Sequence, residues 1–328
     1  MEKTSAVTRR HFITSSCYAW VAAMASASPT AARQLWRPQQ QSKVVVQEPW
    51  GRIEQVAEGV WALISTPLQD RKTLSNGAII AGRSRVVVVE AFGSVDGARW
   101  LSEWARKLTG RMVDDVILTH YHGDHAGGIS AYAAEGDRKA ARLRATEATA
   151  VLIREDDARR NRPAEPGRTA LMSAITHFDA DAPTAIDLGN RTISVIPRGG
   201  HTKSDVTIEL DDPRIVIAGD LLWNRMFPNY VDAKPTELSR SVWALGYNRA
   251  QAYIPGHGPL ADHADYQRSI EVLNLVEAAA RKAHQHGVSP AEAARDFKLP
   301  DSLGEWTMFS PRYFEVALTA WSRELAVR

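Results

Sequence analysis

Short apolar runs separated by turn-forming segments begin the folded part of the chain. The runs cover residues 60–65, 78–81 and 86–90, and the segment 75–77 is Ser-Asn-Gly. Runs of four to eight residues that are rich in β-branched side chains and bounded by Gly, Asn or Ser are typical of strands. The pattern predicts an antiparallel sheet at the start of the domain.

Helical spacing follows these runs. Apolar residues recur three or four positions apart from Val95 to Leu108, which predicts a helix, and residues 113–118 form an apolar run that predicts a strand. Residues 160–183 show no clear period. Between these parts the pattern predicts a helix from about Gly127, a strand near 141–145 and a helix over 146–159.

The second half of the chain changes from strands to helices. Apolar runs at 192–196, 206–210 and 215–218 predict strands, and the Asp-Asp-Pro turn at 211–213 predicts a hairpin between the last two. From Asp262 to the end the pattern is helical and gives no further strand signal. We therefore expect an α/β domain over 44–261 and C-terminal helices over 262–328. These helices either pack on the domain or form a homodimer contact.

The first residues differ in kind from the rest. Arg9 and Arg10 directly precede a short apolar stretch over 12–25, and Ala-Ser-Ala at 25–27 fits a cleavage site for small residues. This arrangement resembles a twin-arginine export signal, with a disordered basic tail as the alternative. We expect a signal peptide over 1–27, a linker over 28–43 and a periplasmic or secreted protein. The apolar stretch is too short to span a bilayer, so no stable membrane insertion is expected after the signal is removed.

Composition limits the partners and metal ligands that this chain can be expected to use. The chain has 328 residues, of which 44% are apolar and 24% charged, and a formal charge of +2. These values fit a globular protein and give no field that would favour nucleic acid or a membrane surface as partner. The only cysteine, Cys17, lies in the expected signal. The mature protein would therefore have no disulfide, and any metal ion must be held by nitrogen and oxygen.

The residues with the clearest chemistry lie directly after the run at 113–118. His120, His122, Asp124 and His125 fall within six residues. At a strand end, His120 and His122 would project to the same side and reach one ion. Gly123 would allow a sharp turn. That turn would direct Asp124 and His125 to a second position about 3.5 to 4 Å away, the spacing of two-metal hydrolases.

Three later residues complete a pattern. His201, Asp220 and His257 each lie beside a glycine at an apolar run. With the earlier cluster they resemble the metallo-β-lactamase superfamily, whose pattern is His-x-His-x-Asp-His followed by a His, a bridging Asp and a final His. The resemblance covers roughly residues 50 to 260. It implies an αββα metallo-β-lactamase sandwich, here with a short helical C-terminal extension.

The resemblance also implies a ligand set and a reaction. Two Zn²⁺ ions per chain suit nitrogen and carboxylate ligands, and Mn²⁺ or iron stay open. A hydroxide that bridges the metals would attack the carbonyl of a lactam, lactone, ester or thioester, and Asp124 would also orient it and carry a proton. The implied ligands are His120, His122 and His201 for the first metal, Asp124, His125 and His257 for the second, and Asp220 for both.

The sequence predicts the substrate less closely than it predicts the metal ligands. The acidic residue Asp220 resembles the bridging residue of glyoxalase-type thioesterases and lactonases, whereas one β-lactamase subclass has cysteine there; hydrolysis of β-lactams stays among the options. Trp223, Phe227 and Tyr230 are candidates for binding a small-molecule substrate, with residues 66–75 as a flap across the site. Ordinary core packing is the alternative for these aromatic residues.

Two other functions stay open on the same fold. A mononuclear iron sulfur dioxygenase would use two His and one Asp, and a metal-dependent binding protein would hold metal without turnover. Nucleic acid is not an expected partner, because the stretch between His125 and His201 is too short for the domain that nucleases of the superfamily insert there.

Overall fold

The computed structural model describes residues 42–327. The expected signal peptide over 1–27, and all but the end of the expected linker, therefore lie outside the described residues. Within residues 42–327, no helix combines the length and the apolar character needed to cross a membrane.

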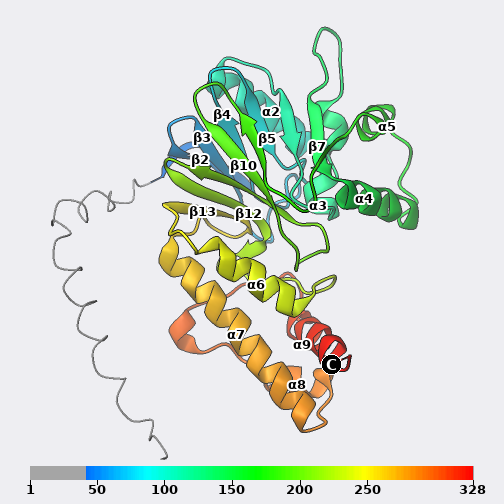
Figure 1. Ribbon diagram of the computed structural model, residues 1–328, viewed down its shortest axis with the longest axis vertical. Helices are drawn as coiled ribbons and strands as arrows, with labels where there is room; N and C mark the ends of the chain where they lie inside the picture. The colour runs from blue at the N-terminus through cyan, green and yellow to red at the C-terminus, as the bar shows by residue number, and fades with distance from the viewer. Residues whose placement is uncertain (1–41, 328) are drawn as a thin grey trace, which may run out of the picture. The chain divides into compact units, whose positions relative to one another are not determined.

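Two sheets form the centre of the domain (Figure 1). The first is antiparallel from β1 to β5 and parallel from β5 to β8. This confirms the predicted antiparallel start. In order across the sheet its strands are β1 (Lys43–Glu48), β2 (Gly51–Ala57), β3 (Val60–Ser65), β4 (Gly77–Ala81), β5 (Val86–Val89), β6 (Asp115–Ile117), β7 (Arg142–Thr146) and β8 (Thr176–Phe178).

The second sheet has five strands in the order β13-β12-β11-β10-β9. Its pairs are antiparallel except β12 with β13, which are parallel. The predicted hairpin is confirmed, since β11 and β12 pair across residues 211–214. The strands are β9 (Thr184–Asp187), β10 (Thr192–Pro197), β11 (Val206–Asp211), β12 (Arg214–Trp223) and β13 (Ala252–His257).

Apolar side chains bury the facing surfaces of the two sheets. Ile80 and Val87 of the first sheet share one buried cluster with Ile208 and Ile217 of the second. All four valines of β5 are buried, because helix α2 (Val95–Thr109) covers the sheet's other face. Burial on both faces explains why these strands have continuous apolar runs instead of alternation.

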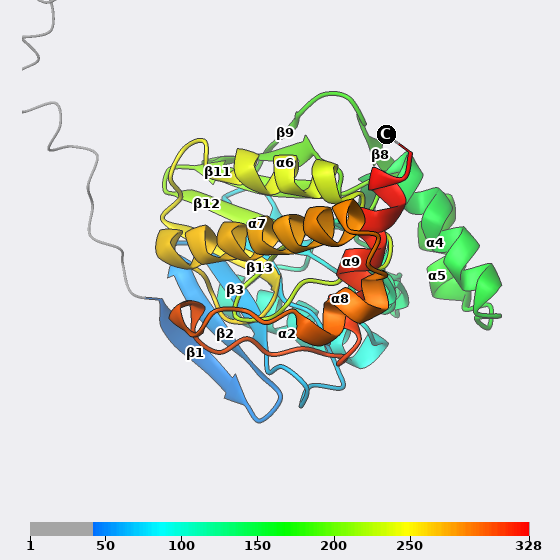
Figure 2. The same cartoon turned by 90° about the horizontal axis from the view of Figure 1, so that it is seen from below.

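The helices complete a four-layer arrangement. Helices α6 (Pro235–Leu245) and α7 (His263–Gln285) lie on the second sheet, on the side away from the first (Figures 1 and 2). The fold is therefore the predicted αββα sandwich. The remaining helices are α3 (Gly123–Ala126), the 3-10 helix η1 (Ile129–Tyr132), α4 (Glu147–Arg159), α5 (Pro166–Ser173), α8 (Pro290–Asp296), the 3-10 helix η2 (Asp301–Leu303) and α9 (Tyr313–Leu325).

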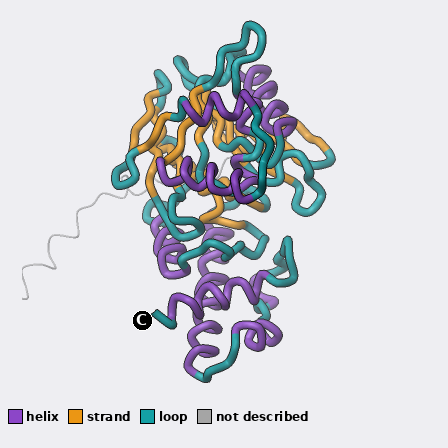
Figure 3. The backbone as a smooth tube through the Cα atoms, turned by 90° about the vertical axis from the view of Figure 1, so that its right-hand side faces the viewer, coloured by secondary structure: helices purple, strands orange, loops and turns teal. Residues whose placement is uncertain are grey.

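The C-terminal helices pack on the sandwich, one of the two predicted alternatives. Figure 3 shows the helices near the C-terminus gathered on one side of the strands. Ile270 and Val276 of α7 and Trp321 of α9 are buried in one cluster with Val216 and Tyr253 of the second sheet. Helix α7 begins with a capping box in which Asp262 and Asp265 bond to each other's backbone N–H groups. The extension is thus continuous with the core of the domain.

Three local features differ from the predictions: the helix expected from Gly127, the stretch 160–183 and the end of β12. No long helix begins at Gly127; α3 has one turn and η1 follows it. Gly128 packs so closely that an added Cβ would lie 2.3 Å from the carbonyl oxygen of Ser94. Helix α5 lies in the stretch without a clear period. Strand β12 runs on to Trp223, so Asp220 lies within a strand and not after its end.

Candidate metal centre

The seven predicted ligands come from five parts of the fold and meet in one place. His120 and His122 lie in the loop after β6, and Asp124 and His125 lie in α3. His201 follows β10, Asp220 lies in β12 and His257 ends β13. All are buried except His122 and Asp124, which are half-buried.

Three histidines and one carboxylate form the first group. The Nδ1 atom of His122 lies 3.2 Å from Nε2 of His120 and 3.0 Å from Nε2 of His201. The Oδ2 atom of Asp220 lies 3.3 Å from Nε2 of His201 and 3.8 Å from Nε2 of His120. All four ligand atoms lie within 4.8 Å of one another. This set of nitrogen and oxygen donors suits a zinc ion.

The second group lies on the other side of Asp220. The Oδ2 atom of Asp124 lies 3.2 Å from Nε2 of His257 and 3.6 Å from Nε2 of His125. The Oδ1 atom of Asp220 lies 3.1 Å from Nε2 of His125 and 3.4 Å from Nε2 of His257. Asp220 therefore directs one oxygen to each group, which is the geometry expected of a bridging ligand.

Unpaired buried atoms test whether metal ions fit these groups. Within residues 42–327, Nε2 of His125, Nε2 of His257 and Oδ1 of Asp220 are buried and make no hydrogen bond. Buried polar atoms almost always have a partner, so three unpaired atoms that point at one another need an explanation. Coordination of a metal ion provides one, and the residues present fit it.

Comparisons with known proteins agree with this geometry. The family model described as "Metallo-beta-lactamase superfamily" matches residues 71–275. The chain belongs to the metallo-beta-lactamase superfamily. Among curated proteins, "Metallo-beta-lactamase type 2" of Bacillus sp. (strain 170) is 25% identical over 244 residues, which cover 72% of this chain and 88% of that protein.

Two further members of the superfamily show how far the likeness extends. "Hydroxyacylglutathione hydrolase" of Erythrobacter litoralis (strain HTCC2594) is 24% identical over 214 residues, covering 63% of this chain and 74% of that protein. The solved structure of DIM-1 metallo-beta-lactamase exposed to ceftazidime is 25% identical, with a TM-score of 0.54, and covers 70% of this chain and 98% of that one. The superfamily's hydrolases thus include proteins named for different substrates.

His201 of the first group and His257 of the second have pKa values shifted in opposite directions. Burial lowers the pKa of His201 to about 4. Burial also opposes the charged form of His257, but the carboxylates of Asp220 and Asp124 outweigh it and raise the pKa of His257 to about 9. For Asp124, burial is outweighed by His125 and His257, which lower its pKa to about 2. Near neutral pH the second group therefore holds protonated histidine beside ionised carboxylate.

Metal binding should consequently release protons. A metal ligand must be a neutral imidazole, and His257, with a pKa of about 9, is protonated at pH 7. We expect at least one proton to be released per chain at pH 7, and zinc affinity to rise as the pH rises toward 9. Titration calorimetry in buffers with different ionisation enthalpies measures the release. No proton released at pH 7 would contradict this account.

A buried carboxylate that the sequence analysis missed supports the ligands from behind. Glu90 follows β5 with a φ of 82°, a backbone conformation that is uncommon outside glycine. Its Oε1 atom lies 3.1 Å from Nδ1 of His125, and its carboxylate accepts a hydrogen bond from the Thr119 hydroxyl. The Thr119 Oγ1 atom lies 2.9 Å from Nδ1 of His120. The Glu90 carboxylate thus faces Nδ1 of His125 at ion-pair distance, and the Thr119 hydroxyl contacts Nδ1 of His120.

A second missed carboxylate holds His122. The Oδ2 atom of Asp232 lies 2.9 Å from Nε2 of His122, and Asp232 also accepts a hydrogen bond of 2.5 Å from the Tyr121 hydroxyl. The Nδ1 atom of His201 lies 3.2 Å from the carbonyl oxygen of Asn229. Such partners fix which nitrogen of each histidine faces a metal ion.

Replacing Glu90 tests this support. We expect Glu90→Gln to lower zinc affinity about 10- to 100-fold, the usual effect of losing a carboxylate behind a histidine ligand. Competition with a chromophoric chelator measures the affinity. Glu58→Gln, in an exposed turn, is the matched control and should leave the affinity unchanged. An unchanged affinity in Glu90→Gln would show that Glu90 does not position His125.

Gly256, and not the predicted Gly123, is the glycine that the candidate centre requires. A Cβ on Gly256 would lie 1.9 Å from Oδ1 of Asp220, so only glycine fits there. The expected turn at Gly123 is not needed: Gly123 opens α3, its φ is not positive, and an added Cβ would meet no atom within 4 Å. Strand β6 also ends earlier than predicted, at Ile117. The loop after β6 therefore places His120 and His122, and α3 places Asp124 and His125.

The predicted substrate-binding aromatic residues separate into two kinds. The Trp223 ring lies 4.1 Å from the His257 ring and therefore supports a ligand. Phe227 and Tyr230 are 0% and 1% exposed and belong to the core beneath the C-terminal helices, where Phe227 packs 4.8 Å from Phe314. For these two residues the structure shows core packing, the alternative considered above, and no surface for a substrate.

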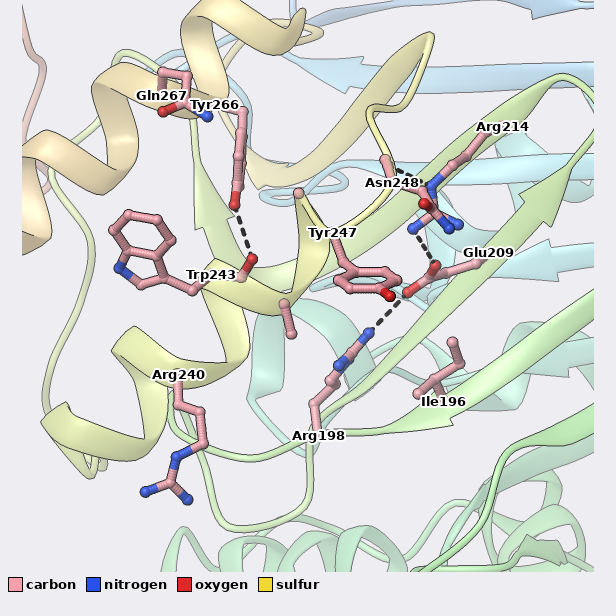
Figure 4. A pocket seen from close by; sticks show the side chains of 12 residues that line it. Ile196, Arg198, Glu209, Arg214, Arg240, Trp243, Tyr247, Asn248, Tyr266 and Gln267 are labelled. Carbon is pink, nitrogen blue, oxygen red and sulfur yellow. Dashed lines mark hydrogen bonds and ion pairs between the residues drawn. The ribbon is translucent and has the colours of Figure 1, made fainter. Parts of the chain in front are cut away.

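Cavity size does not identify the site. A cavity of about 760 Å³ lies over the second sheet and α6, lined by residues that include Trp243 and Tyr247 (Figure 4). It contains none of the seven ligands, and its buried carboxylate, Glu209, is paired with Arg198 and Arg214. A smaller cavity of about 290 Å³ includes Asp124. The chemistry of the lining therefore favours the smaller one.

Proposed function

We propose that this chain is a dinuclear zinc hydrolase that cleaves a lactam, lactone, ester or thioester. The observation that carries the proposal is Asp220, whose two oxygens face two separate sets of ligand atoms. A mononuclear iron dioxygenase would need only one such set. The two named relatives support hydrolysis without choosing a substrate.

The residues have distinct tasks in this reaction. Bound zinc would polarise the carbonyl and lower the pKa of water from 15.7 to about 7. His120, His122 and His201 would hold one ion, and Asp124, His125 and His257 the other. Asp124 is the candidate proton carrier, because its side chain is 31% exposed whereas that of Asp220 is 3% exposed. Asp124 is ionised at neutral pH, because His125 and His257 lower its pKa to about 2.

Turnover by the zinc-loaded protein tests the proposal. The substrates would be a chromogenic β-lactam, an aryl ester, a lactone and a glutathione thioester. We expect hydrolysis of at least one of them, its loss after chelation and its return with zinc. One iron per chain and oxygen consumption with persulfide substrates would favour the dioxygenase, and two zinc ions without turnover would favour a binding protein.

We also propose that the chain is exported through a twin-arginine signal over residues 1–27. The support is the sequence alone: Arg9-Arg10, the apolar stretch and the Ala-Ser-Ala segment at 25–27. Sequencing the N-terminus of the protein from the periplasmic fraction tests this, and an intact N-terminus in the cytoplasmic fraction would contradict it.

A further inference from the structure

The segment between α8 and α9 reaches the metal centre from outside the family match, which ends at residue 275. Thr307 fixes it with two backbone hydrogen bonds of 2.9 Å: its N–H donates to the carbonyl of Arg225, and its carbonyl accepts from the N–H of Phe227. Arg225 lies two residues after the end of β12, the strand that carries Asp220. The extension is therefore held beside the ligands.

Phe309 is the residue of this segment that contacts the candidate metal centre. Its ring lies 5.3 Å from the His257 ring and 5.8 Å from the Trp223 ring, edge to face in both cases. Phe309 is nevertheless 40% exposed. The ring thus packs against Trp223 and His257 and also lines the 290 Å³ cavity that includes Asp124.

Leucines of the segment between β3 and β4 face the same cavity. Leu68 is 48% exposed and Leu74 is half-buried. Both have positive φ values, 64° and 66°, a conformation that costs free energy in residues other than glycine. Two leucines in this conformation beside an exposed phenylalanine leave apolar surface in contact with water, which a ligand with an apolar group would cover.

The polar groups of the cavity hold the segment in place. The Asp70 carboxylate accepts hydrogen bonds from the N–H groups of Lys72, Thr73 and Leu74. One nitrogen of Arg71, Nη1, donates to the carbonyls of Leu68 and Asp70. Asp70 is thus occupied within the loop and Arg71 is tied to its backbone. Leu68, Leu74 and Phe309 offer a substrate apolar contact near Asp124.

We propose that Phe309, opposite Leu68 and Leu74, forms a specificity pocket for an apolar group of the substrate. This inference rests on the proposed function and deepens it: the preferred substrates are acyl compounds with a compact alkyl or aryl substituent. Phe309 acts by binding that substituent, and Asp124 stands at the reacting end of the same cavity.

Binding and turnover test the pocket separately. Calorimetry measures the affinity of the zinc-loaded protein for acetate and hexanoate, and kinetics compare the p-nitrophenyl esters of both acids. We expect hexanoate to bind at least about tenfold more tightly than acetate, and Phe309→Ala to remove about tenfold of that preference. In turnover, the variant should raise KM for the hexanoyl ester about tenfold with kcat kept, which is the sign of lost uniform binding.

Matched variants separate the pocket from general damage. Phe309→Leu keeps an apolar side chain and should restore most of the preference. Trp243→Ala removes another aromatic residue, 54% exposed, from the separate cavity of Figure 4 and should change nothing. Equal losses for acetate and hexanoate, or no preference in the wild-type protein, would overturn the pocket. A preference lost in Phe309→Ala, with no hydrolysis of any β-lactam, ester, lactone or thioester, would uphold the pocket and overturn the proposed hydrolase.

Discussion

Asp220→Asn is expected to lower kcat/KM for hydrolysis by about a thousandfold or more, the largest effect of any substitution considered. Asp220 gives one oxygen to each ligand group, at 3.3 Å from His201 and 3.1 Å from His125. Asparagine has one oxygen and no charge, so it can serve only one group. Polarisation by a metal ion contributes several kcal/mol and each 1.36 kcal/mol is tenfold in rate, so losing an ion gives a loss of about this size.

The variant must be measured for metal as well as for rate. Elemental analysis should find fewer than two zinc ions per chain in Asp220→Asn at zinc concentrations that saturate the wild-type protein. Asp211→Asn, at the end of β11 with a side chain that is 92% exposed, is the matched control and should keep both the metal and the rate. Two zinc ions and an unchanged rate in Asp220→Asn would mean that Asp220 does not bridge.

Gly256→Ala is expected to have the second largest effect, although glycine has no side chain to bind metal. The added Cβ would lie 1.9 Å from Oδ1 of Asp220 and must push that carboxylate out of place. We expect zinc affinity to fall at least about tenfold. Because the neighbours are also backbone atoms of a buried strand, the free energy of unfolding should fall by about 1–3 kcal/mol.

A second glycine in the same centre provides the control. Gly123→Ala lies between two predicted ligands, but its Cβ would meet no atom within 4 Å. We expect it to keep zinc affinity, and to keep the free energy of unfolding within about 0.5 kcal/mol. Chelator competition and chemical denaturation of both variants make the comparison. If Gly256→Ala bound zinc as the wild-type protein does, the close fit around Asp220 would not matter for the metal centre.

Sequence patterns predicted the seven residues that meet at the candidate metal centre, but not the residues that surround them. The seven candidate ligands could be listed because their order and spacing are local features of the chain. Glu90 and Asp232 could not, since each meets its histidine only through tertiary structure: Glu90 lies after β5 and Asp232 in a loop after β12. Their own sequence neighbourhoods contain no metal-binding pattern that would have identified them.

In the fold and the pocket, too, local sequence patterns predicted some features and missed those that depend on tertiary structure. Continuous apolar runs identified β3, β4 and β5, but α5 was missed, since Arg168 is a charged residue that is buried against Asp157 and the carbonyl of Ala126. An aromatic residue near a ligand gives the same signal in a core as in a pocket. The sequence therefore predicted Phe227 as a pocket residue and did not predict Phe309, which lies in the C-terminal extension.

The central claim is that two ions lie on either side of Asp220, and anomalous diffraction from crystals of the zinc-loaded protein tests it most directly. Data collected on both sides of the zinc absorption edge should show two peaks about 3.5–4 Å apart. One peak should lie among His120, His122 and His201, and the other among Asp124, His125 and His257. A single peak at saturating zinc, or none beside Asp220, would contradict the account.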